Sequence, residues 1–237
     1  RGAWTHYSGP DHPIRPWGDS WPNWARMAGT EPRHIEHVDK TMLMTFLHWD
    51  ADAPVQPVEH SPLPTAVCAE GTGTATFRTS WNPDAVFAAL LGGGRNRACF
   101  GHAHADCGHF NIAVGGEYLA VDTGRYNTNE DQHSVVLIDG TNQHESSAPG
   151  KGMTFDQTSG RLGEFQRHRM LDYCVADASY MKSAIWALRN FLFIRTRADD
   201  GYIVLLDNIN VDNGLTPHEY WWQLHGATTA RIAITGK

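Results

Sequence analysis

Residues 101–122 read GHAHADCGHFNIAVGGEYLAVD and contain two apolar runs, Phe110–Val114 and Tyr118–Val121, on either side of a glycine pair. Each run has the length and the β-branched or aromatic content of a strand, and a glycine pair between two such runs is typical of a tight turn. The stretch therefore predicts a β-hairpin. A histidine-rich segment precedes this hairpin, and Asp122 follows it.

The same pattern of short apolar runs continues toward the C-terminus. Four more runs of strand length are separated by turn-forming Gly, Asn and Asp: Val135–Ile138, Phe191–Thr196, Tyr202–Leu206 and Glu219–Leu224. A further apolar run, Ala85–Leu91, is left open between helix and strand by its pattern alone. Short strands joined by turns predict a mostly β fold, a large antiparallel β-sandwich.

The first part of the chain has a different pattern. Apolar residues recur there every three or four positions, after Thr30 and Pro32 as signals of a helix start: Ile35, Val38, Met42, Phe46 and Trp49. This spacing predicts an amphipathic helix, and the four prolines at 54–64 predict a linker. We expect a helical segment with its linker over residues 1–60, and the sandwich over residues 61–237. The chain begins with Arg1 and ends in a strand-like run, so we expect a fragment or a processed chain.

The composition excludes several classes of protein. Hydrophobic residues make up 41% of the chain and aromatic residues 11%, which excludes a disordered chain. No apolar run approaches the roughly 18 residues of a spanning helix, so we expect no membrane insertion. The formal net charge of −7 gives no basic field for nucleic acid, which we do not expect as a partner. The 4 cysteines form no CxxC pair and are too few for a disulfide scaffold.

Histidine chemistry is indicated instead by the 14 histidines and by their clustering before the hairpin. His102 and His104, two positions apart on an extended segment, point to the same face, so both imidazoles can serve one site. Asp122 closes one strand and His133 opens another, so neighbouring strands can bring these groups to one point. Imidazole and carboxylate suit Zn²⁺ or a similar divalent ion. The alternative is that all four are polar strand-end residues in ordinary hydrogen bonds.

Three families carry an HxH motif on a strand, and two of them fit poorly. A cupin places a Glu shortly after the second His, where this chain has Gly108. An amidohydrolase barrel needs alternating helices, which residues 140–237 do not supply. The runs GHAHADCGHF, GGEYLAVDTGRY and QHSVVLIDGTNQ, at 101–110, 115–126 and 132–143, together resemble the signature of the heparinase II/III-like family of polysaccharide lyases. Further stretches support the resemblance, which covers roughly residues 14–225: Pro16–Ser20, Phe77–Trp81, Phe191–Arg195, Tyr202–Asp207 and Glu219–His225.

This resemblance implies a fold and an activity. The fold is an α/α toroid followed by an antiparallel β-sandwich, so the helical segment of this chain would be a short remnant of the toroid. The activity is a β-elimination that cuts a uronic-acid polysaccharide, a glycosaminoglycan or alginate. The resemblance also implies that His102 is the catalytic His of the sandwich and that His104, Asp122 and His133 bind a structural metal ion, Zn²⁺. It implies a periplasmic or secreted location.

Four more residues are candidates for the site. Tyr126 matches a position where some alginate-cleaving relatives have an additional active-site Tyr, with an ordinary loop aromatic as the alternative. Arg95, Arg97 and Arg125 are candidates for contact with substrate carboxylate or sulfate, with solvated loop charges as the alternative. The gap from Asp122 to His133 is shorter than the resemblance leads us to expect, which leaves His144 as a substitute ligand.

Two other functions stay open at this point. In the family, a Tyr acid/base and a group that neutralises the uronate lie in the helical part, so we expect this chain alone to lack part of the catalytic set. One alternative is a non-catalytic, metal-stabilised sandwich that binds carbohydrate. A weaker alternative is a cupin-like metal-dependent oxygenase, which would need redox-active iron.

Overall fold

The computed structural model describes residues 57–92, 104–124, 129–140, 143, 160–197 and 199–227. The chain divides into two compact units, one formed by Arg1–Leu63 with Trp81–Pro83 and the other by Pro64–Ser80 with Asp84–Lys237. The described part of the first unit contains the short 3-10 helix η1 (Val58–His60). The predicted helix at 30–49 lies outside the described residues. Among those described, no helix is long and apolar enough to cross a membrane.

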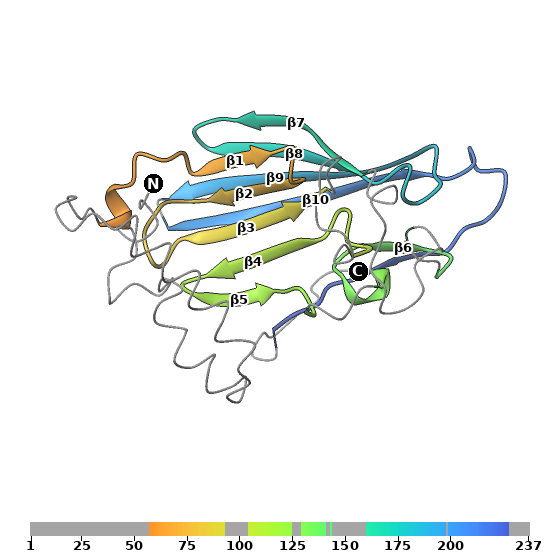
Figure 1. The fold of residues 1–237 in the computed structure, drawn as a ribbon, viewed down its shortest axis with the longest axis horizontal. Helices are drawn as coiled ribbons and strands as arrows, with labels where there is room; N and C mark the ends of the chain where they lie inside the picture. The colour runs from red at the N-terminus through yellow and green to blue at the C-terminus, as the bar shows by residue number, and fades with distance from the viewer. Residues whose placement is uncertain are drawn as a thin grey trace, which may run out of the picture. The chain divides into compact units, whose positions relative to one another are not determined.

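The second unit begins with an antiparallel meander (Figure 1). Its strands are β1 (Ala66–Ala69), β2 (Thr74–Arg78), β3 (Val86–Leu91), β4 (Phe110–Val114) and β5 (Glu117–Ala120), paired in chain order. Two glycines form the turn between β4 and β5, with φ of 57° at Gly115 and 79° at Gly116. Glycine adopts such positive angles at the lowest steric cost. The predicted hairpin is therefore present, and β4 has the predicted bounds.

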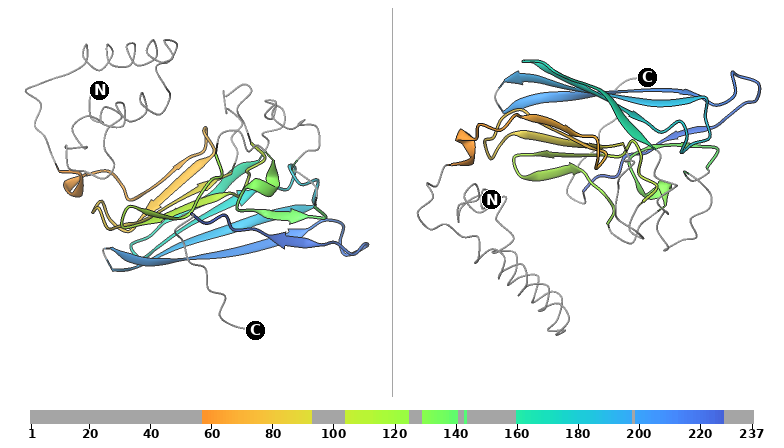
Figure 2. Two further views of the ribbon diagram at one scale, coloured as in Figure 1. Left: turned by 90° about the horizontal axis from the view of Figure 1, so that it is seen from below. Right: turned by 45° about the horizontal axis from the view of Figure 1, so that its top comes forward.

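A second antiparallel sheet comes later in the chain. Its strands are β7 (Arg161–Arg167), β8 (Leu171–Asp177), β9 (Trp186–Arg197) and β10 (Asp200–Asn210), in the order β10-β9-β8-β7. A separate pair joins β6 (Val136–Ile138) to β11 (Tyr220–Trp222), with the 3-10 helix η2 (Glu130–Gln132) ahead of β6. Figure 2 shows the two larger sheets as two layers.

Side chains from both sheets meet in one core. The Phe77 ring on β2 stacks on Phe191 of β9, with ring centroids 5.0 Å apart, and lies 5.9 Å from Phe193. Small and aliphatic residues of both sheets fill the rest of this core: Ala75, Ala88, Leu90, Cys174 and Ala176. Sheets packed face to face over such a core make an antiparallel β-sandwich, as predicted.

Strand β3 shows why an apolar run can be a strand at this position. Alternate residues Val86, Ala88 and Leu90 are buried, while those between them are partly exposed. The run therefore covers a core on one face, which periodicity in the sequence alone does not reveal. At its end, a side chain at Gly92 would come within 2.4 Å of Leu162 in the opposite sheet, so the close approach of the two layers requires glycine there.

Candidate metal centre

Three of the predicted ligands lie together. One side-chain donor atom from each of His104, Asp122 and His133 falls within 4.8 Å of the other two. The His104 and His133 ring centroids are 5.3 Å apart, and Asp122 Oδ2 lies 3.3 Å from His133 Nδ1. The structure thus brings together side chains that are up to 29 positions apart in the sequence. The substitute ligand, His144, lies outside the described residues.

The three side chains come from loops at strand ends: Asp122 follows a strand as predicted, whereas His104 lies in a loop and not on a strand. His104 precedes β4 in a segment that turns back on itself through a hydrogen bond from His109 N to Asp106 O, 2.8 Å. Strand β5 ends at Ala120 because the next amide, Val121 N, donates to His225 O instead of to the β4 ladder. His133 follows η2 and does not open β6.

Hydrogen bonds hold the Asp122 and His133 loops in place. Thr123 Oγ1 donates to Gln132 O at 2.7 Å, which joins the loop after β5 to the end of η2. The Gly124 amide donates to Asp122 Oδ1 at 2.6 Å, with a φ of 110° at this glycine. One carboxylate oxygen is thereby occupied by the backbone. The other, Oδ2, faces the histidines.

A third histidine, His109, completes the surroundings of Asp122 and was not among the predicted site residues. Its ring is fully buried, and its Nδ1 accepts a hydrogen bond from Ser134 N at 2.9 Å. The ring proton therefore sits on Nε2, which is 3.3 Å from Asn111 Oδ1 and 3.8 Å from Asp122 Oδ2. Burial, with the nearby His133, lowers the pKa of His109 to about 4, so this ring is neutral near pH 7.

The donor groups fit a divalent cation. His133 is fully buried, and among the described residues neither of its ring nitrogens has a well-aligned hydrogen bond, although Nδ1 lies 3.3 Å from Asp122 Oδ2. An unsatisfied buried polar group is costly, and a metal ion would satisfy one of these nitrogens. Interaction with the His133 ring, helped by the Gly124 amide, holds the pKa of Asp122 well below its usual range. A carboxylate with two imidazoles is a donor set typical of zinc.

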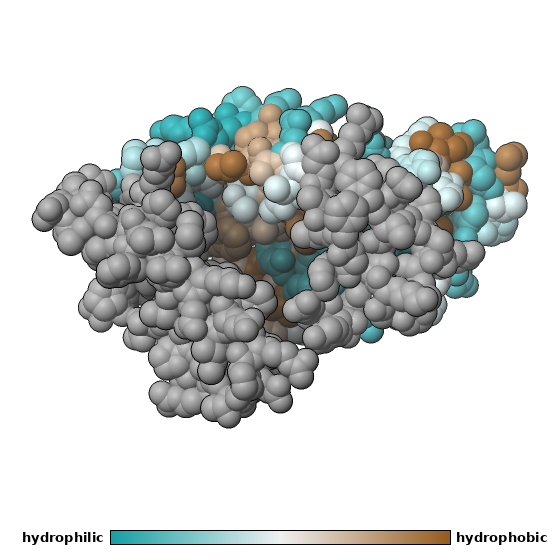
Figure 3. All heavy atoms as spheres, in the orientation of Figure 1, coloured by the Kyte–Doolittle hydropathy of each residue, from teal (hydrophilic) through white to brown (hydrophobic). Residues whose placement is uncertain are grey.

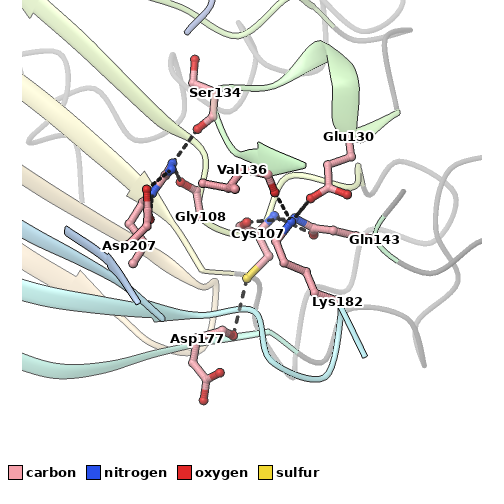
Figure 4. A network of polar contacts seen from close by, with 10 residues as sticks. Cys107, Gly108, Glu130, Ser134, Val136, Gln143, Asp177, Lys182 and Asp207 are labelled. Atoms are coloured by element: carbon pink, nitrogen blue, oxygen red, sulfur yellow. Dashed lines mark hydrogen bonds and ion pairs between the residues drawn. The ribbon is translucent and has the colours of Figure 1, made fainter. Parts of the chain in front are cut away.

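Arg189 ties these loops to the sandwich. It comes from β9 of the second sheet, and its Nη1 donates to the carbonyls of Gly108 and Ser134, 2.7 Å each. Its Nε and Nη2 pair with the two carboxylate oxygens of Asp207 at 2.7 and 2.9 Å. Figure 4 shows the partners of this guanidinium close together: Gly108, Ser134 and Asp207. Since Gly108 and Ser134 adjoin His109 and His133, Arg189 positions both histidine loops.

A buried polar network fixes η2 from its other side. Glu130 accepts hydrogen bonds from Lys182 Nζ and, at 2.9 Å, from Gln143 Nε2. Lys182 also donates to Val136 O at 2.6 Å, and Gln143 bonds the backbone of Cys107 in both directions (Figure 4). Burial raises the pKa of Glu130, although Lys182 opposes this shift. The network joins the His104 segment to the helix that leads into His133.

Replacing Arg189 by Met should lower the free energy of unfolding by about 3–5 kcal/mol, because the Asp207 carboxylate and two carbonyls would lose their partner. Arg161→Met is the matched control: this arginine on β7 also pairs with an aspartate, Asp177, but its side chain is 72% exposed. The control should cost less than about 1 kcal/mol. Urea unfolding measures both values, and equal costs for the two variants would contradict the anchoring role.

The remaining predicted site residues cannot be placed. His102, Tyr126, Arg95, Arg97 and Arg125 all lie outside the described residues. Their roles stay predictions from the sequence. The His104 segment, which begins two residues after His102, is described and belongs to the cluster.

Comparison with known proteins gives a family and a set of similar structures. The C-terminal domain of heparinase II/III-like proteins matches residues 81–229. A heparinase III, the BT4657 gene product, is 21% identical, with a TM-score of 0.49 over 62% of this chain and 22% of that one. The heparan sulfate lyase HepC from Pedobacter heparinus is 17% identical, with a TM-score of 0.48 over 81% of this chain and 27% of that one. The chain thus spans about a quarter of these structures. The search of curated proteins finds no match.

Proposed function

Because the match over residues 81–229 shows that this chain belongs to the heparinase II/III-like family, we propose that it provides the sandwich part of a polysaccharide lyase. In this proposal the substrate is an anionic polysaccharide that contains uronic acid, a glycosaminoglycan or alginate, and the reaction is β-elimination. The observation that carries the proposal is the cluster of His104, Asp122 and His133, whose ligand atoms lie within 4.8 Å of one another. A periplasmic or secreted location belongs to the same proposal.

The reaction sets demands that these residues are suited to meet. The proton at C5 of a uronate is weakly acidic, so the enzyme must neutralise the carboxylate, remove this proton and protonate the departing oxygen. We assign His102 to the first or the second task, and Tyr126 to proton transfer. Arg95, Arg97 and Arg125 are assigned to substrate carboxylate or sulfate. In the family, helical residues outside the sandwich complete the set.

The metal has a structural role in this proposal. His104, Asp122 and His133 would hold Zn²⁺, which supplies a fixed positive charge that joins three loops. His104 and His102 are two residues apart, so a fixed His104 restricts where His102 can reach. Arg189 and Thr123 hold the loops that carry His133 and Asp122 through the hydrogen bonds described above.

The test is a panel of heparan sulfate, chondroitin sulfate, hyaluronan and alginate, incubated with the full-length gene product. We expect one class of polymer to yield an unsaturated uronate, which is detected by its ultraviolet absorbance. Retention of a polymer on the immobilised protein, with no absorbance from any member of the panel, would contradict the proposal and favour a non-catalytic carbohydrate-binding sandwich. The family match leaves the cupin-like oxygenase without support.

A further inference from the structure

A polar hollow lies in the sandwich, away from the metal cluster. It has a volume of about 390 Å³ and is lined by hydroxyl and cationic side chains: Thr65, Thr79, Arg167, His168, Arg169 and Arg195. We call it the β7–β8 pocket, because three of its six residues lie at the end of β7 and in the turn that follows. Figure 3 shows hydrophilic surface in the upper left, where β7 turns into β8.

This pocket and the metal cluster lie at opposite ends of the first sheet. Thr79 N bonds Val86 O at the start of β3, whereas Leu91 N, at the end of β3, bonds His109 O beside the metal cluster. Val86 and Leu91 are five positions apart on an extended strand, a distance of about 17 Å. The pocket is therefore a separate site.

The charges in the pocket are positive and only partly compensated. Arg195 pairs with the fully buried Asp172 and lies over the Phe193 ring, so its charge is neutralised and its position fixed. Arg167 and Arg169 are exposed, and no described carboxylate forms an ion pair with either of them. Two guanidinium groups that have no ion-pair partner among the described residues therefore line one hollow in a chain whose net charge is −7.

The polar atoms of the pocket are arranged as donors. Thr79 Oγ1 already accepts from Val86 N at 3.1 Å, and Thr65 Oγ1 accepts from Arg195 Nη2 at 3.3 Å, so both hydroxyl protons can be donated to a ligand. The turn is held by His168 N donating to Leu171 O at 2.9 Å, and by Arg195 N donating to Met170 O at 2.8 Å. The backbone of the turn that carries Arg169 is therefore fixed before a ligand arrives.

We propose that the β7–β8 pocket binds a sulfate or carboxylate group of an acidic oligosaccharide, as a second glycan-binding site remote from the metal cluster. Guanidinium and hydroxyl donors match an oxyanion, and the volume falls within the usual range for small-ligand sites, about 300–1,000 Å³. The choice of a polysaccharide as the ligand rests on the proposed function. Occupying this site would hold a long substrate on the sandwich while another part of it is cleaved elsewhere.

The test measures binding by the full chain, with no catalysis required. Isothermal titration with a heparan sulfate oligosaccharide should show about tenfold weaker binding for Arg167→Gln/Arg169→Gln than for the unchanged chain. Arg161→Gln, a control on the same strand, should bind as the unchanged chain does. Because all three arginines are exposed, thermal melting should show that every variant folds. An unsulfated uronate oligosaccharide in a parallel titration tells whether sulfate or carboxylate is the group bound.

The outcomes separate this proposal from the proposed lyase activity. Tenfold weaker binding by the double variant alone supports the pocket, even if no polymer in the panel is cleaved. Equal binding by the double variant and the unchanged chain would overturn it. Equal weakening by Arg161→Gln would also overturn it, since the attraction would then be general. Equally tight binding of a single-stranded oligonucleotide of matched charge would contradict a site for sugar oxyanions.

Discussion

Zinc is expected to raise the melting temperature of the unchanged chain by about 10 °C, and His133→Ala is expected to abolish this rise. A ligand present at about 1,000 times its Kd stabilises the folded state by about 4 kcal/mol, and each kcal/mol is worth roughly 2–4 °C in a chain of this size. His133 is fully buried and its Nδ1 lies 3.3 Å from Asp122 Oδ2, so its loss removes one of the three proposed ligands. Calorimetry of chelated and zinc-loaded samples measures the rise.

For each variant, the melting temperature of the zinc-loaded sample is compared with that of the chelated sample. This difference excludes the destabilisation that the substitution causes by itself. Truncating a buried ring leaves a cavity that destabilises the fold whether or not metal is present, so this cost cancels in the difference. His60→Ala, an exposed histidine in η1, is the control and should keep the full rise. If zinc raised the melting temperature of His133→Ala as much as that of the unchanged chain, His133 would not be a ligand.

The second large effect is expected for His102→Ala in the full-length gene product, with a loss of turnover on the order of a hundredfold or more. A positioned acid, base or neutralising group contributes about this much to such a reaction. The measurement is the initial rate of unsaturated uronate formation on the polymer that the panel identifies. Full activity of His102→Ala would contradict the role assigned to it.

A matched substitution two residues away separates catalysis from folding. His104→Ala loses a proposed metal ligand, so it should melt at a lower temperature than His102→Ala and lose the rise given by zinc. His102→Ala should keep that rise, because His102 is not a ligand in this account. An equal loss of zinc stabilisation in both variants would mean that the two histidines share the metal.

The sequence predicted the parts of the fold that depend on local pattern. The β4–β5 hairpin follows from two apolar runs around glycines that have positive φ, a requirement that the residue type itself reveals. Strand β7 could not be predicted, because five of its seven residues are glycine or polar and its pairing with β8 shifts register between Gly163 and Gln166. Strand β8 places Asp172 in a buried position, where Arg195 from β9 compensates it. Such a pairing between strands leaves no signal in the local pattern.

In the candidate site, the proposed ligands were predicted from the sequence, but the residues that hold them in place were not. A shared site of His102, His104, Asp122 and His133 was predicted from their places next to strands, and the resemblance implied that the last three bind metal; the structure brings those three into one cluster. His109 and Arg189, which hold the ligand loops, were not predicted, although His109 lies within the GHAHADCGHF run. A histidine ahead of a strand is indistinguishable from a surface residue until Ser134 is known to donate to it. Arg189 lies 55 positions from Ser134, and only the packing of two sheets brings them together.

The metal content of the purified chain is the most direct test of the proposed metal centre. The protein is prepared without chelators, and elemental analysis is run beside a His104→Ala/His133→Ala variant prepared in the same way. We predict about one zinc or similar divalent ion per unchanged chain and none above background in the variant, because two of three protein ligands would be gone. No stoichiometric metal in the unchanged chain, or the same amount in both proteins, would contradict the account.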